Sequence, residues 1–256
     1  MSHLKNVLSP VGTPTADRTV GEMVAEMPAR SRVFQSHQID FCCQGGRTVR
    51  EACELRGVDL GRVVGELEKP TLAVQMSDEN PAELPPAELV RYIVRVFHEP
   101  LRMELPRLRA MAQRVAQVHG GHTPALREVL ELFLQLEAEL SVHLLKEEQV
   151  LFPAVIAMTE GVAEPHSVDG PIACMLHEHE DAGVALSRLR TLTNGFTPPS
   201  DACNTYRALF SGLAELEEAL HRHIHLENSV LFPEARALVS RGGPAREMQG
   251  AIVKQA

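Results

Sequence analysis

The chain has 256 residues, of which 44% are hydrophobic, and a formal net charge of −9. This length allows one or two domains with a substantial core, and the hydrophobic content excludes a chain that is disordered throughout. The acidic balance, without a run of Lys or Arg, makes a nucleic-acid backbone or an anionic membrane a poor partner. Only 4% of the residues are aromatic and Trp is absent, so Leu, Val and Ala must fill the core, which favours helices over a β-sandwich.

The sequence gives no sign of export or of a membrane span. It has neither an apolar N-terminal signal segment nor an apolar run of about 18 residues. The 5 cysteines are odd in number and sparse, unlike the cysteine pattern of a secreted disulfide framework. These features predict a protein of the reducing cytoplasm.

The N-terminal part of the chain is expected to form a small helical domain. "TVGE" (19–22) and "TVRE" (48–51) both fit the capping box, so a helix is expected to begin at each. A stretch rich in Pro then predicts a linker. The expected boundaries are 17–70 for this domain, 71–86 for the linker, 87–240 for a second domain and 241–256 for a tail.

Cys42 and Cys43 lie in a Gly-rich loop just before the helix start expected at Thr48. A helix N-terminus lowers the pKa of a thiol and raises its reactivity, so the pair is a candidate for redox chemistry or transient iron handling. A buried, inert pair is the alternative. The other three cysteines have no companions in the sequence and are expected to fill the core: Cys53, Cys174 and Cys203.

The second domain shows four long helical patterns, and the breaks between them are turn-like. Long amphipathic helices joined by short loops predict an all-α, up-down four-helix bundle. The expected helices span roughly 87–118, 124–159, 170–193 and 201–240.

An internal repeat carries the chemistry. "HLLKEEQVLFP" (143–153) and "HIHLENSVLFP" (223–233) both read His-x3-Glu-x2-Val-Leu-Phe-Pro. His98 and His179 precede the two copies at similar distances. The pattern predicts a duplicated helical hairpin.

Four histidines and two glutamates of this repeat continue the apolar stripes of their helices in steps of three and four, so they are expected to face inward. A buried carboxylate without a partner costs several kcal/mol or becomes neutral, whereas a pair of metal ions would supply the missing positive charge. Two glutamates could bridge two ions and leave two histidines for each, as in di-iron or di-manganese bundles, and the mixed N/O ligand set favours iron over zinc. The predicted ligands are His98, His143, Glu147, His179, His223 and Glu227.

Other residues near the repeat were weighed for the same site. His221 and His225 fall on other faces than His223 and are expected to be dispensable for metal. His119 lies on the stripe of the first helix, but about 31 Å beyond His98 at 1.5 Å per residue, which argues against ligation. For Glu139 and Glu178 two interpretations stay open: surface acids, or carboxylates that hold a ligand or relay protons beside the metals.

Together, these motifs resemble the repair-of-iron-centres family, whose members are hemerythrin-like di-iron proteins with a short N-terminal Cys-Cys domain of ScdA type. The resemblance rests on the six predicted ligands, on "HEHEDAG" (177–183) and on "IDFCCQGGRTVREAC" (39–53). It implies a hemerythrin-like bundle with two non-haem irons, oxo-bridged, in a cytoplasmic homodimer. It also implies that the protein repairs iron–sulfur clusters of client proteins damaged by nitrosative and oxidative stress, by donating iron.

The chain departs from the family pattern after His98, where a second histidine is expected three residues on and Leu101 stands instead. Pro100 and Pro106 are expected to kink the helix there. The metal is expected to remain, because the missing histidine is not one of the six inward ligands. Two other functions stay open: an O2 or nitric oxide carrier or sensor, and an enzyme that reduces nitric oxide at the irons. The Cys-Cys domain favours repair over a simple carrier.

Overall fold

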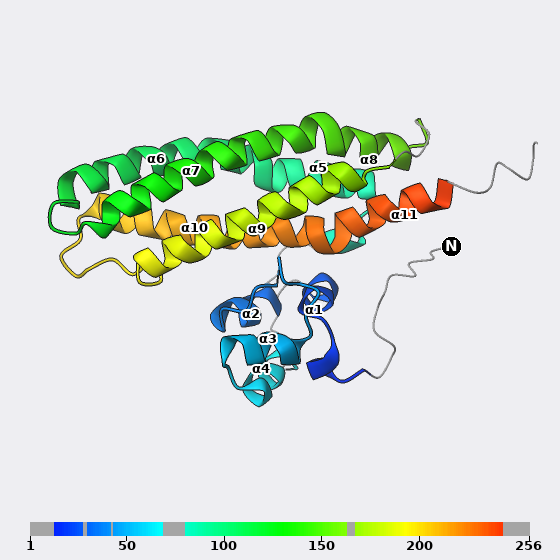
Figure 1. Cartoon of the computed structure of the whole chain (residues 1–256), viewed down its shortest axis with the longest axis horizontal. Helices are drawn as coiled ribbons and strands as arrows, with labels where there is room; N and C mark the ends of the chain where they lie inside the picture. The colour runs from blue at the N-terminus through cyan, green and yellow to red at the C-terminus, as the bar shows by residue number, and fades with distance from the viewer. Residues whose placement is uncertain (1–12, 28–29, 42, 69–79, 163–166, 243–256) are drawn as a thin grey trace, which may run out of the picture. The chain divides into compact units, whose positions relative to one another are not determined.

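The computed structural model describes residues 13–27, 30–41, 43–68, 80–162 and 167–242 (Figure 1). The chain forms two compact units: residues 1–84 together with 224–230, and residues 85–223 together with 231–256. Within the described ranges the regular structure is helical. None of the helices found there has both the length and the apolar composition that a membrane span requires.

Both capping boxes of the N-terminal part are confirmed. Thr19 caps α1 (Val20–Glu26) reciprocally with Glu22, and Thr48 caps α3 (Val49–Arg56) with Glu51. The two capping residues form an antiparallel bridge with each other, so α1 and α3 begin side by side. The remaining short helices of this part are η1 (Thr15–Asp17), α2 (Ser31–Ser36) and α4 (Leu60–Leu67).

The Gly-rich loop that carries the cysteine pair is tightly packed. The N–H of Gly21 donates to the carbonyl of Gly45 at 2.9 Å, and a Cβ on Gly45 would lie 2.9 Å from the carbonyl oxygen of Phe41. Cys43 is half-buried, and its N–H donates to Asp40 Oδ1 at 2.9 Å. Cys42 lies outside the described residues, so the geometry of the pair stays a prediction.

The second part of the chain forms the expected four-helix bundle, and the four expected helical spans are confirmed to within a few residues. Figure 1 shows α6, α7, α9 and α10 running alongside one another. A short 3-10 turn, η3 (Pro81–Glu83), precedes the first of them. The segments are α5 (Pro86–Ile93), η4 (Val94–His98) and α6 (Glu99–His119); α7 (Ala125–Lys146), η5 (Glu147–Leu151) and α8 (Phe152–Thr159); α9 (Asp169–Leu192); and α10 (Asn204–Leu226), η6 (Glu227–Leu231) and α11 (Phe232–Gly242).

Three of the four long helices of the bundle contain a π-helical segment: η4, η5 and η6. Each segment ends two residues before a proline, namely Pro100, Pro153 and Pro233. A proline has no N–H to continue the ladder of i→i−4 hydrogen bonds. In two segments the residue before the proline instead donates five residues back, from Glu99 to Val94 and from Phe152 to Glu147. Pro106, also expected to kink the helix, lies inside α6 without ending it.

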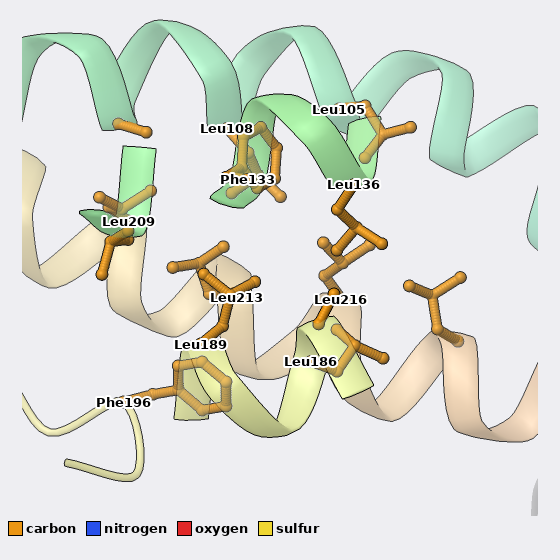
Figure 2. Close-up of a cluster of buried hydrophobic side chains, with 14 of the residues drawn as sticks. Leu105, Leu108, Phe133, Leu136, Leu186, Leu189, Phe196, Leu209, Leu213 and Leu216 are labelled. Atoms are coloured by element: carbon orange, nitrogen blue, oxygen red, sulfur yellow. The ribbon is translucent and has the colours of Figure 1, made fainter. Parts of the chain in front are cut away.

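One large cluster of buried hydrophobic side chains fills the half of the bundle toward the α6–α7 turn. Figure 2 shows leucines of all four helices and Phe133 meeting there, with Phe196 from the connection after α9. Steps of three and four residues bring these side chains to one face of each helix. The same stripes continue into the other half of the bundle, where the predicted ligands lie.

Candidate metal centre

The structure brings all six predicted ligands together in the interior of the bundle. None of them is more than 4% exposed, and both glutamates are 0% exposed. Their ligand atoms fall into two groups, and within each group all of them lie within 4.8 Å of one another. The groups share both carboxylates: one is His98, Glu147, His223 and Glu227, and the other is His143, Glu147, His179 and Glu227.

The histidines meet in pairs through their Nε2 atoms. His98 and His223 approach to 3.1 Å, and so do His143 and His179. Two nitrogens that each lie about 2.1 Å from one ion, at a right angle, are about 3.0 Å apart, so each pair has the spacing of two ligands on one ion. Glu147 Oε2 lies 3.5 Å from His98 Nε2 and 3.4 Å from His143 Nε2, between the two pairs.

The charges of this cluster also fit metal ions. Two carboxylates that are wholly removed from water require compensating positive charge, and neutral imidazoles do not provide it. Two divalent cations, each between one histidine pair and the two shared glutamates, would supply it. The mixture of imidazole nitrogen and carboxylate oxygen is a donor set that suits iron, manganese or zinc.

Hydrogen bonds fix the ring orientation of two of the histidines. His98 Nδ1 donates to Glu148 Oε1 at 2.7 Å, and His143 Nδ1 donates to Glu178 Oε2 at 2.9 Å. Because an ionised carboxylate can only accept, each Nδ1 carries a proton, which leaves Nε2 as the nitrogen that can ligate a metal. The structure thus places Glu178 beside a ligand, as one of the two interpretations anticipated.

The carboxylates of Glu148 and Glu178 are kept ionised by their surroundings. Burial alone would raise the pKa of Glu148, but hydrogen bonds from His98 and Arg102 outweigh it and lower that pKa. Burial likewise opposes ionisation of Glu178, whereas hydrogen bonds from Lys146 and His143 lower its pKa to about 2. Each carboxylate is therefore a full negative charge at neutral pH.

Phenylalanine rings of the repeat stack on the imidazole rings of two ligand histidines. Phe152 stacks on His98 with ring centroids 5.5 Å apart, and Phe232 stacks on His179 with centroids 5.9 Å apart. These are the same positions in the two copies, so the duplication explains the Phe of "VLFP". This role was not predicted from the sequence, although the repeat was the signal for it. Phe97 packs in the same way on His223, at 5.3 Å.

Two other residues that were weighed for the site are not brought to the cluster, as was expected for His119. Glu139 is exposed, and its Oε1 accepts a hydrogen bond from Gln135 at 2.9 Å. His119 is the last residue of α6, and its Nε2 lies 3.3 Å from Cys203 Sγ. Neither belongs to the two ligand groups.

His225, expected on another face than His223 and dispensable for metal, is 3% exposed, and burial lowers its pKa to about 4. It is still in neither ligand group. Cys53 fills the core as expected, whereas Cys174 and Cys203 are exposed because they lie on the outer side of α9 and just before α10.

Comparisons with known proteins agree with this geometry. Residues 90–235 match the hemerythrin HHE cation binding domain, and residues 16–71 match the ScdA_N domain of unknown function. An iron-sulfur cluster repair protein YtfE of Edwardsiella ictaluri is 41% identical over 220 residues, which cover 86% of this chain and 96% of the relative. The proteins of the same name from Pectobacterium atrosepticum and Escherichia coli O1:K1 are 38% and 35% identical, over 86% of this chain and 96% and 97% of theirs. The chain therefore belongs to the hemerythrin-like family of iron–sulfur cluster repair proteins.

Proposed function

We propose that the protein binds two iron ions in the bundle and donates iron to iron–sulfur clusters damaged by nitrosative and oxidative stress. One observation carries the proposal: two buried ligand groups that share Glu147 and Glu227. The names of the relatives, iron-sulfur cluster repair protein, support the same role. Cytoplasmic location, a homodimer, and damaged iron–sulfur proteins as clients belong to this proposal. So do Cys42 and Cys43 as thiols that handle iron or electrons.

The ligand set suits a site that gives iron away. Iron–sulfur clusters hold iron through thiolate and sulfide, whereas this site offers imidazole and carboxylate. Ferrous iron is held more weakly than copper or zinc by such ligands, which suits a site that releases its metal. Because both glutamates are shared, a chain that has lost one ion keeps two histidines and two carboxylates for the other. The geometry therefore supports release in two steps.

The experiment uses a [4Fe–4S] enzyme whose cluster has been damaged by nitric oxide. The iron-loaded protein should restore its activity faster than the same amount of free ferrous iron. Glu147→Gln should abolish the advantage, whereas Glu128→Gln, which removes only an exposed ion pair with Arg188, should preserve it. Restoration no faster than with free iron would reject donation as the mechanism.

The closeness of the two groups also favours a second candidate, in which two nitric oxide molecules react at neighbouring ions. Reduction to nitrous oxide follows 2 NO + 2 e⁻ + 2 H⁺ → N2O + H2O, and it requires an external electron donor. Nitrous oxide in the headspace of the reduced, iron-loaded protein, above the level of Glu147→Gln, would support it. A spectral change with nitric oxide or O2 that produces neither nitrous oxide nor repair would instead indicate a carrier or sensor.

A further inference from the structure

Glu148 and Glu178 belong to the same structural device, which occurs twice around the cluster. In each case a carboxylate directly follows or precedes a predicted ligand of its own helix. This carboxylate accepts a hydrogen bond from a histidine ligand on a neighbouring helix. It also forms an ion pair with a basic residue that lies one helical turn after that histidine. Glu148 joins His98 Nδ1 at 2.7 Å to Arg102 Nη2 at 2.5 Å.

The second copy of the device has the same design with different residues. Glu178, beside His179, joins His143 Nδ1 at 2.9 Å to the ammonium of Lys146. The thiol of Cys174 donates to the same carboxylate at 3.4 Å. The side chains of both carboxylates are 26% exposed, so each connects a buried ligand to the surface.

The two devices contact different ligand groups. His98 belongs to the ligand group with His223, and His143 belongs to the group with His179. Each candidate ion therefore has one histidine whose ring is fixed by a carboxylate and a cation. The shared glutamates couple the two ions, but the carboxylate–cation pairs do not.

We infer that Glu148, held by Arg102, is a positioning residue that retains the ion bound by His98 and His223, independently of the other ion. Glu178 and Lys146 serve the second ion in the same way. The inference rests on the proposed function to the extent that the cluster holds two iron ions. It adds that the two ions have separate controls, so that iron can leave one position while the other stays filled.

The physical reason lies in the imidazole ring. Without a charged acceptor at Nδ1, the ring of His98 can turn or take the other tautomer, in which Nε2 carries the proton and cannot ligate. An ionised acceptor also makes Nε2 a more basic ligand. Loss of such a partner typically costs about 10–100-fold in metal affinity. Glu148→Gln keeps the size of the side chain and removes the charge, so it tests this role directly.

The experiment follows the release of ferrous iron from the loaded protein to an excess of a coloured chelator, without oxygen and without any client. In Glu148→Gln, one iron per chain should be released about 10–100-fold faster than in the wild type, and the other at the wild-type rate. Glu178→Gln should give the same pattern, and the double variant should release both irons fast. Glu128→Gln, which removes an exposed ion pair with Arg188, is the control and should match the wild type.

Several results would overturn the inference. It fails if Glu148→Gln leaves both rates unchanged, if it accelerates both irons equally, or if the double variant still has only one fast iron. A Glu148→Gln protein that loads a single iron supports the inference when that iron leaves at the wild-type rate, and contradicts it otherwise. If the wild type binds no iron, the proposed function fails as well; if it binds two and both leave independently of Glu148, only this inference fails.

Discussion

Replacing Glu147 with Gln should stabilise the metal-free protein while weakening its response to metal. Glu147 is 0% exposed and belongs to both ligand groups. Burying one ion costs several kcal/mol in a protein interior, so removing the charge of Glu147 while keeping the size of the side chain should stabilise the metal-free chain by about 1–4 kcal/mol. For a protein of this size each kcal/mol shifts Tm by about 2–4 °C. The metal-free variant should therefore melt about 2–16 °C above the metal-free wild type.

Adding metal should reverse the order of the two melting temperatures, so that the wild type melts above Glu147→Gln. With free ferrous iron at about 100 times each dissociation constant, one ion contributes about 2.7 kcal/mol and two contribute about 5.4 kcal/mol. The wild type should then gain about 11–22 °C in Tm, and Glu147→Gln, which lacks a ligand of both ions, should gain much less. Circular dichroism melts at pH 8, with and without ferrous iron under anaerobic conditions, measure both effects. A variant that is less stable than the wild type without metal, or that keeps the full gain with it, would refute the reasoning.

Two further predictions concern buried groups outside the cluster. Burial lowers the pKa of His225 to about 4, so this histidine stays neutral in the folded state, whereas in the unfolded chain it binds a proton below about pH 6.5. The free energy of unfolding therefore has its full value above that pH and falls as the pH is lowered toward 4. Urea denaturation at pH 7 and 5 should show a loss of about 2 kcal/mol that His225→Gln does not suffer; equal losses would contradict this. Arg190→Met should destabilise the bundle by about 3–5 kcal/mol because Glu217, only 2% exposed, loses its cation. Arg190→Met combined with Glu217→Leu should recover most of the loss, and a double variant as unstable as the single one would argue against the ion pair.

The apolar stripes predicted the four helices and which residues face inward, because burial of one face is what a helical sequence pattern records. The device around Glu148 could not be predicted in this way. A residue next to an inward ligand points about 100° away, along the flank of its helix, and its partner depends on which helix lies on that side. The sequence pattern does not specify the order of helices around a bundle, so the contact with His98 becomes visible only in the structure.

Glu139 and His225 show two other limits of prediction from the sequence pattern. A step of four residues leaves a rotation of about 40°, so Glu139, one turn before His143, drifts to the exposed side of α7. His225 lies in the stretch 224–230, which belongs to the same compact unit as residues 1–84. A helical pattern cannot reveal such a grouping of residues far apart in the sequence. Each π segment ends two residues before a proline (Pro100, Pro153 or Pro233), but Pro106 lies inside α6 without one, so a proline in the sequence does not by itself predict the segment.

The account depends most on the two ligand groups, and the metal content of the purified protein with its optical spectrum tests them most directly. We expect two irons per chain in the wild type and in His225→Ala, because His225 is buried but belongs to neither group. His223→Ala, which removes one of the two histidines of its group, should lose most of its iron. Zinc in place of iron, one ion per chain in the wild type, or an unchanged iron content in His223→Ala would contradict the account.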